Sequence, residues 1–244
     1  MKDGLFHFKK FSVSHTRSSM KVGVDGVLIG AWASTCAGDI LDAGTGCGVI
    51  ALMLAQRNPD SKVLAIDIDM PSIAEAKDNF SNSPWGERLE ALKISYDEMC
   101  ASENMSFDLI VSNPPFYLSG VSDFSTARNI ARHQGDFSPE ALISNASGIL
   151  NEGGRVAMIV PSEFFHGLQV TGICNGLSLQ RSVFVKDHPS APVKRVMMEF
   201  LKSEKNKEDR IYTTDEIPVL TMFDAKGIPT PEYRELGKDF YLKF

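Results

Sequence analysis

The sequence predicts an α/β fold, with one mostly parallel sheet of seven strands and helices on both faces. Apolar, strand-like runs alternate with helix-like stretches through most of the chain, as in repeated β–α–β units. Some runs, such as FDLIVSN at 107–113, are apolar at nearly every position, which is typical of parallel strands covered on both faces. A glycine-rich turn, LDAGTGCG at 41–48, joins one such run to a helix.

The first elements follow from periodicity and boundary residues. Residues 1–24 are mixed, basic and aromatic, and the run 25–34 then predicts a helix for which Asp25 is available as the N-cap. A strand at Ile40 and Leu41 passes through the glycine turn into a helix that ends soon after Arg57, before Pro59.

The remaining elements alternate to the end of the sheet. Pro71 is tolerated in the first turn of one helix, and glycine closes another. The predicted strands are 61–69, 89–95, 107–113, 155–161, 178–188 and 193–203, and the predicted helices are 71–80, 138–154 and 162–177.

Composition limits the classes of protein. The net charge of −6 argues against a protein that coats nucleic acid non-specifically, although a local basic groove stays compatible with it. No apolar run is long enough for a membrane helix, and the N-terminus lacks a signal-peptide pattern. The cysteines form no CxxC or Cys/His spacing, which favours reduced thiols in a cytoplasmic protein without a metal site: Cys36, Cys47, Cys100 and Cys174.

The glycine turn is a candidate cofactor site. Gly44, Thr45, Gly46 and Gly48 permit positive φ angles and close backbone approach at a helix N-terminus. The stretch 46–51 also fits the G-x-G-x-x-G/A form of a dinucleotide site, and a tight turn without a ligand is a further alternative.

Two acidic residues distinguish between these ligands. Asp42, directly before the glycines, would repel a pyrophosphate but can hold an ammonium group, directly or through water. S-adenosylmethionine carries an ammonium and no phosphate. Asp67, followed by Ile68, ends the second strand and is placed to accept two ribose hydroxyls. The alternatives for Asp67 are an exposed acid at a strand end or a helix N-cap, and Asp69, ahead of Pro71, fits the cap better.

The motifs together resemble the class I S-adenosylmethionine-dependent methyltransferases. LDAGTGCG resembles their first motif and VLAIDID their second, while SNPPF resembles the fourth motif of the members that methylate exocyclic amino nitrogens. This resemblance covers about residues 38–200 and implies a Rossmann-like fold with S-adenosylmethionine as cofactor.

A closer resemblance includes both ends of the chain. MKVGVDGVLIGAWA at 20–33, ARH at 131–133 and DFYL at 239–242 are similar to the bacterial tRNA1(Val) adenine-N6 methyltransferase family, with Val24 where that family usually has threonine. This resemblance implies methylation of N6 of adenine 37 in the tRNA anticodon loop. It also suggests a single domain with a lid or substrate segment (1–37), a catalytic core (38–201) and a packed C-terminal extension (202–244).

The NPPF stretch has a chemical explanation. Asn113 offers a side-chain carbonyl and Pro114 a backbone carbonyl, and two aimed acceptors favour the pyramidal amine that attacks a sulfonium methyl. Pro115 biases Pro114 away from helical geometry and leaves its carbonyl free, while Phe116 can stack on the base. The alternative is that Asn-Pro simply ends a strand.

Other candidates lie outside these motifs. Asp97, after the third strand, is expected near the adenine amine, or is a turn-forming residue. Lys21, Gly23 and Asp25 are expected to close over the methionine end of the cofactor.

Basic residues supply the candidate RNA contacts, with a solvated surface as the alternative. They are Arg128, Arg132, His133, Lys194 and Arg195. The charge-rich stretch 202–210 is predicted to be a solvated loop, and the aromatic-rich tail 211–244 is predicted to pack.

Alternative functions stay open. The same chemistry suits guanine N2 of ribosomal RNA, adenine N6 of DNA, or a protein glutamine. A non-catalytic cofactor-binding scaffold is disfavoured by the intact NPPF, since it has no need of two aimed acceptors. The sequence does not indicate an oligomeric state.

Overall fold

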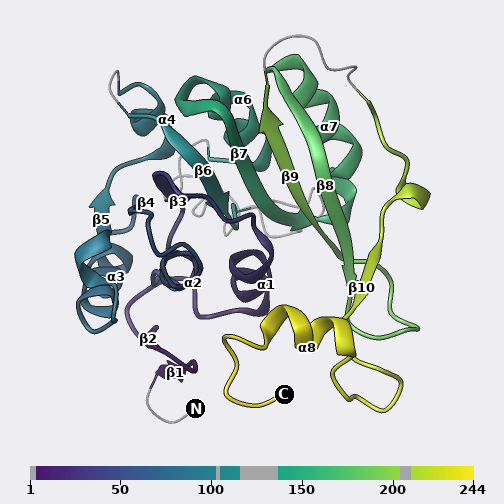
Figure 1. The fold of residues 1–244 in the computed structure, drawn as a ribbon, viewed down its shortest axis with the longest axis horizontal. Coiled ribbons are helices and arrows are strands. Elements are labelled where there is room, and N and C mark those ends of the chain that lie inside the picture. Colours follow the sequence, from purple (N-terminus) through teal and green to yellow (C-terminus); the bar gives the residue numbers. More distant parts are fainter. Residues whose placement is uncertain (1–3, 103–104, 116–136, 204–209) are drawn as a thin grey trace, which may run out of the picture.

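A computed structural model describes residues 4–102, 105–115, 137–203 and 210–244. Its main sheet has eight strands in the order β10-β8-β9-β7-β6-β3-β4-β5 (Figure 1). The predicted α/β class is confirmed, and the predicted count of seven strands is too low by one. The strands are β3 (Ile40–Ala43), β4 (Val63–Asp67), β5 (Leu89–Lys93), β6 (Phe107–Ser112), β7 (Leu150–Pro161), β8 (Leu177–Lys186), β9 (Arg195–Lys202) and β10 (Val219–Thr221).

Pairing in this sheet is mostly parallel, and β9 is antiparallel to both β7 and β8. The described helices are α1 (Val24–Trp32), α2 (Val49–Arg57), α3 (Met70–Ser81), α4 (Tyr96–Cys100), α6 (Pro139–Ile149), α7 (Phe165–Cys174) and α8 (Pro231–Gly237), with 3-10 turns η1 (Gly86–Arg88), η2 (Ser162–Phe164) and η3 (Thr214–Glu216).

The eighth strand, β10, comes from the C-terminal tail. Its three residues pair in parallel with Phe184–Lys186 at the end of β8. In the sequence this segment is only the apolar stretch IPVLTMF at 217–223 of the tail, and three of its residues form a strand because the tail is carried past the open edge of β8.

Apolar side chains form a core on each face of the sheet. Along β6, Leu109 and Val111 contribute to the core beneath α1, α2 and α3, while Ile110 contributes to the core beneath α4, α6 and α7. Successive strand residues point to opposite faces, so a strand covered on both sides is apolar throughout. The two groups of helices are separate in Figure 1.

Two predicted helix boundaries are wrong. α1 begins at Val24 with Gly23 as N-cap, so Asp25 lies in the first turn and does not cap the helix. α6 ends at Ile149, and the glycines expected to close it lie within β7. There the register jumps from Leu150 to Arg155 opposite β6, and the bulge uses the left-handed Gly153 (φ +76°).

The two ends of the chain meet. A two-stranded hairpin, β1 (Leu5–His7) and β2 (Ser12–Ser14), lies beside the C-terminal tail (Figure 1). Phe8 and Tyr241 form an isolated bridge, and Lys9 N donates to Phe240 O at 2.8 Å. The tail therefore packs against the N-terminal hairpin.

Candidate active site

Three candidate segments meet at one edge of the sheet. β3 lies between β4 and β6, with Ala43 opposite both Ile66 and Ser112. The glycine turn follows β3, Asp67 ends β4, and Asn113 follows β6. The chain continues from β3 to β4 on one side and reaches β6 on the other, which makes this the topological switch point where such sheets bind ligands.

The glycine turn is tight and left-handed. Gly44, Gly46 and Gly48 have φ angles of +75°, +54° and +84°. Gly48 is the N-cap of α2, and a Cβ on it would lie 2.6 Å from Phe80 Cε1. Gly44 N and Thr45 N both donate to Ile66 O at 2.9 Å, so this loop is attached to the end of β4. Any other residue would be strained at these three glycine positions.

Asp42 lies beneath the glycine turn and is fully buried. Its Oδ2 accepts from Thr45 Oγ1 at 2.6 Å and from Ala51 N at 3.0 Å, while its Oδ1 is buried without a hydrogen-bond partner in the described part of the chain. Burial raises the pKa of Asp42 to about 7, although these two hydrogen bonds favour the carboxylate. Its contact with a cofactor ammonium stays a prediction.

Asp67 is half-buried at the end of β4, next to the half-buried Ile68. Its Oδ2 accepts from Gly46 N and its Oδ1 from Asp69 N, both at 2.9 Å. Burial raises its pKa, and the hydrogen bonds from Asp69 and Gly46 oppose that rise. Asp69 Oδ2 accepts from Ser72 N at 3.1 Å, so the prediction that Asp69, and not Asp67, caps α3 is confirmed.

The described part of the NPPF stretch lies beside the glycine turn. Ser112 Oγ donates to Ala43 O at 2.7 Å and fixes the end of β6 against the end of β3. Asn113 and Pro115 are half-buried and Pro114 is buried, while Phe116 lies outside the described residues. The amide of Asn113 therefore follows a strand end that is held beside the glycine turn.

Several residues at this edge were not predicted. The ring of Phe137 packs over the glycine turn, with Cε1 3.2 Å from a Cβ placed on Gly44. Ser72, Glu75 and Asn79 are buried along one face of α3. Their spacing of three and four residues is a polar stripe on a helix face that should be apolar, and this signal could have identified them.

The secondary cofactor candidates are more exposed. Asp97 is exposed in the first turn of α4, and its Oδ1 accepts from Asn145 Nδ2 at 3.2 Å. Lys21 and Gly23 are exposed on either side of Val22, whose backbone N donates to the buried His15 Nδ1 at 3.0 Å. Their cofactor roles stay predictions.

Asp25, Lys194 and Arg195 form one ion-pair group with Asp187. Arg195 Nε lies 2.5 Å from Asp25 Oδ1, and Arg195 Nη1 lies 3.2 Å from Asp187 Oδ1. Lys194 Nζ lies 3.4 Å from Asp187 Oδ2. Burial raises the pKa of Asp25, and Arg195 opposes that rise. Both cations thus have acidic partners in place.

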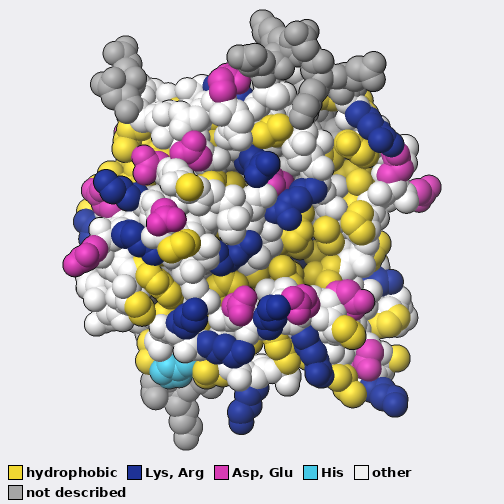
Figure 2. Space-filling model, viewed as in Figure 1, with side chains coloured by type: hydrophobic (Ala, Val, Ile, Leu, Met, Phe, Trp, Pro, Cys, Tyr) yellow, Lys and Arg dark blue, Asp and Glu magenta, His cyan; other side chains and the backbone are white. Residues whose placement is uncertain are grey.

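The other RNA candidates lie outside the described residues: Arg128, Arg132 and His133. On the face seen in Figure 2, Lys and Arg side chains are interspersed with acidic and apolar ones. No described helix is long and apolar enough to cross a bilayer. The described ranges also contain no group of three or more His, Cys, Asp or Glu side chains placed to hold a metal.

The residues at the glycine turn fit the predicted cofactor. The left-handed glycines leave backbone uncovered by Cβ atoms, and Asp67 offers a half-buried carboxylate. Asp42 has a buried oxygen that finds no hydrogen-bond partner in the part of the chain that the structure describes. Carboxylates suit ribose hydroxyls and an ammonium, and the loop carries no lysine or arginine for a pyrophosphate.

Comparisons with known proteins agree with this arrangement. A family model described as "methyltransferase small domain" matches residues 24–167. A predicted O-methyltransferase from Agrobacterium tumefaciens has a similar fold, with a TM-score of 0.65 and 19% identity over 88% of this chain and 96% of that chain. The 16S rRNA guanine-N2 methyltransferase of Thermus thermophilus, in complex with AdoMet and guanosine, gives 0.53 and 18% over 82% of this chain and 50% of that chain.

Curated relatives match along the whole chain. The tRNA1(Val) (adenine(37)-N6)-methyltransferase of Parabacteroides distasonis is 39% identical over 100% of both chains. The protein of that name from Trichodesmium erythraeum is 38% identical over 98% of both. A third, from Flavobacterium johnsoniae, is 37% identical over 98% of this chain and 100% of its own. With the glycine turn, Asp67 and Asn113 at one edge of the sheet, the chain belongs to the tRNA1(Val) (adenine(37)-N6)-methyltransferase family.

Proposed function

We propose that this protein transfers a methyl group from S-adenosylmethionine to N6 of adenine 37 in the anticodon loop of tRNA1(Val). The observation that carries this proposal is the full-length similarity to relatives of that name, such as the one from Parabacteroides distasonis. That similarity includes both terminal segments, which lie outside the general methyltransferase match at 24–167. A methyltransferase core alone would leave the acceptor unspecified.

The glycine turn and the two neighbouring carboxylates hold the cofactor in this proposal. Asp67, with Ile68 beside it, receives the ribose hydroxyls, and the left-handed turn of Gly44, Gly46 and Gly48 lets the backbone approach the ligand. The cofactor supplies an electrophilic methyl group on a sulfonium. Asp42 favours the ammonium end through its charge, because its unpartnered oxygen lies beneath the turn.

Asn113 and Pro114 orient the acceptor amine. The Asn113 side-chain carbonyl and the Pro114 backbone carbonyl accept its two N–H groups, and they bind more strongly as positive charge develops on nitrogen. No general base has to act before attack, because the methylated, cationic amine is acidic and loses its proton readily. Phe116 replaces the stacking that a flipped-out base loses, which is about 1–3 kcal/mol per base.

RNA binding uses the basic residues after the NPPF stretch. Arg128, Arg132 and His133 contact phosphates that flank the target base. Lys194 and Arg195 already pair with the carboxylate of Asp187. They therefore contact an RNA phosphate only when the phosphate takes the place of that carboxylate. A tRNA substrate places the reaction in the cytoplasm.

Labelled methyl transfer tests the proposal. The protein is incubated with labelled S-adenosylmethionine and separate tRNA, ribosomal RNA, DNA and protein fractions, followed by nucleoside mass spectrometry. We expect N6-methyladenosine in tRNA, and its loss from a tRNA1(Val) transcript that carries guanine at position 37. Label confined to ribosomal RNA, DNA or protein would instead assign one of the alternative acceptors.

A further inference from the structure

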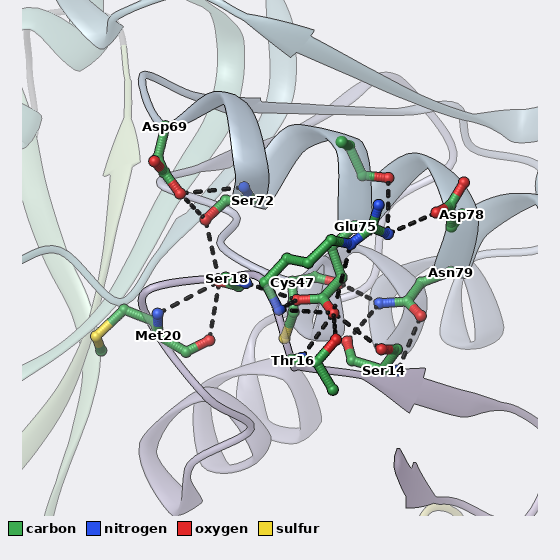
Figure 3. A network of polar contacts seen from close by, with 12 residues as sticks. Ser14, Thr16, Ser18, Met20, Cys47, Asp69, Ser72, Glu75, Asp78 and Asn79 are labelled. Carbon is green, nitrogen blue, oxygen red and sulfur yellow. Dashed lines mark hydrogen bonds and ion pairs between the residues drawn. The ribbon is translucent and has the colours of Figure 1, made fainter. Parts of the chain in front are cut away.

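One buried carboxylate holds a bend of the N-terminal segment. Glu75, in α3, is fully buried and faces residues 14–18 (Figure 3). Its oxygens accept from Ser14 Oγ at 2.8 Å, Thr16 N at 2.7 Å, Thr16 Oγ1 at 3.1 Å, Arg17 N at 3.1 Å and Ser18 N at 2.7 Å. Three consecutive backbone N–H groups therefore converge on a single side chain.

These N–H groups stabilise the charge of Glu75. The side chain of Arg17 is more distant, with Nε 4.0 Å from Glu75 Oε1, and it pairs with Asp78 Oδ2 at 2.5 Å at the surface. Burial on its own would raise the pKa of Glu75, but the hydrogen bonds from Ser18, Arg17, Ser14 and Thr16 lower it overall. The bend thus forms a backbone anion site around the ionised carboxylate.

The same segment continues onto the glycine turn. Ser18 Oγ lies 3.4 Å, and Met20 Cβ 3.6 Å, from the position of a Cβ on Gly46. Ser18 Oγ also donates to Met20 O at 3.0 Å, and this hydrogen bond closes a short turn of residues 18–20 beside the glycine turn. Gly46 N donates to Asp67 Oδ2, so the covered glycine is bonded directly to the candidate ribose carboxylate.

Further contacts attach this segment to both ends of α3. Ser72 Oγ lies 3.1 Å from Ser18 Oγ and 2.6 Å from Asp69 Oδ2 (Figure 3). Asn79 Nδ2 donates to both Ser14 O and Cys47 O at 2.8 Å. The N-terminal segment, α3 and the glycine turn are therefore joined into one polar network.

We propose that Glu75 is a positioning residue for the cofactor site, holding residues 14–18 so that residues 18–20 cover Gly46 and close one side of the loop. This rests on the proposed function, in which the loop binds S-adenosylmethionine. Without the carboxylate, the three backbone N–H groups lose an acceptor that has two charged oxygens, and in glutamine a donor NH2 replaces one of them. The segment then leaves the loop, and the conformation that binds the cofactor is less populated.

The test compares Glu75→Gln with Glu199→Gln. Glu199 is also a buried carboxylate that holds a loop, since it accepts from Ser34 N at 2.8 Å, but it belongs to a different network. Calorimetry with S-adenosylmethionine should give a Kd about tenfold higher for Glu75→Gln, because affinity falls with the competent fraction. Glu199→Gln should stay within about twofold of wild type, and saturating cofactor should restore kcat in Glu75→Gln.

Hydrogen exchange gives a readout without cofactor. The amides of Thr16, Arg17 and Ser18 should exchange faster in folded Glu75→Gln and not in Glu199→Gln. If Glu75→Gln does not fold, the double variant Ser14→Ala/Thr16→Val removes two hydroxyl donors and keeps the charge. It should raise Kd in the same direction, by a smaller factor.

Two outcomes overturn the proposal. One is an unchanged Kd in every folded variant that perturbs this bend, and the other is undisturbed protection of the three amides in folded Glu75→Gln. A wild-type protein that does not bind S-adenosylmethionine would instead refute the proposed function, and the exchange measurement would still report whether Glu75 holds the bend.

Discussion

Two aspartates at the candidate site, Asp42 in β3 and Asp67 at the end of β4, have different environments. Asp42 is fully buried, and one of its oxygens has no hydrogen-bond partner among the described residues, whereas Asp67 is half-buried and accepts two backbone N–H groups. The fully buried carboxylate destabilises the fold when it ionises, and the half-buried one can meet a ligand. Residue type alone therefore does not assign their roles.

Asn113→Ala tests the aimed acceptor. The variant should bind S-adenosylmethionine normally and lose methyl transfer by roughly 10²–10³-fold, the usual cost of removing one group that stabilises the transition state. Calorimetry and single-turnover kinetics measure the two effects. Asn175→Ala, at the end of α7, serves as the matched control. Full turnover by Asn113→Ala would remove the acceptor role.

Asp42→Asn should change how stability depends on pH. The pKa of Asp42 is about 7 in the folded state, against an ordinary 3.8. Between these two pH values the folded state therefore holds a proton that the unfolded state has released. The contribution of protonated Asp42 to the free energy of unfolding of the wild type is present at low pH and is lost as the pH rises towards and through 7. The asparagine variant does not ionise.

Urea unfolding between pH 4.5 and pH 8 measures this difference. The free energy of unfolding of Asp42→Asn, relative to wild type, should rise with pH by on the order of 1–3 kcal/mol. Parallel curves over the whole range would show that Asp42 ionises without cost. Asp239→Asn, at an exposed side chain, is the matched control for replacing an aspartate by asparagine.

At the scale of one element, the start of α2 depends on the absence of a side chain. Gly48 caps the helix in a left-handed conformation, and the ring of Phe80 from α3 occupies the space where a Cβ would lie. Phe80 is 3% exposed and has little room to move. The glycine thus serves both the turn and the contact between α2 and α3.

Gly48→Ala should lower the free energy of unfolding by about 1–3 kcal/mol, because it adds both backbone strain and overpacking. Gly148→Ala is the control, since Gly148 lies within α6 and no described residue comes within 4 Å of a Cβ placed there. That control should be neutral or stabilising by about 1 kcal/mol. Thermal unfolding compares them, and equal melting temperatures for the two variants would contradict the steric explanation.

At the scale of the whole molecule, the C-terminal tail supports the N-terminal hairpin that leads into the bend around Glu75. Phe240 is 2% exposed in the core shared by α1, α2 and the hairpin. Its carbonyl accepts from Lys9 N, and Tyr241 beside it bridges Phe8. Packing between the termini therefore helps to hold the segment that covers the glycine turn.

Phe240→Ala should destabilise the protein by about 3–5 kcal/mol, as is usual for a buried phenylalanine. Hydrogen exchange should also increase in the β1–β2 hairpin, because its partner is lost. Leu242→Ala, at a side chain that is 58% exposed, is the control and should change stability by less than about 0.5 kcal/mol. Unchanged hydrogen exchange in the hairpin of folded Phe240→Ala would show that the tail does not support the hairpin.

Local pattern determined much of this fold. The apolar runs of β3, β4 and β6 are buried on both faces, so their composition alone marked them as inner parallel strands. The turn at Gly44–Gly48 and the acids Asp42 and Asp67 could be predicted from the sequence, because few residue types suit a positive φ angle or the end of a buried strand. Asn113 and Pro114, which follow a strand end, could be predicted for the same reason.

Only the tertiary structure decided the long-range pairings. β10 is a strand because the edge of β8 lies beside it, Arg195 pairs with Asp25 from α1, and Glu75 meets residues 14–18 of the N-terminal segment. Each contact joins positions far apart in sequence, and neither partner carries a local pattern that names the other. The sequence by itself determined the chemistry of the strand ends, and packing decided which charged groups are free and which are held.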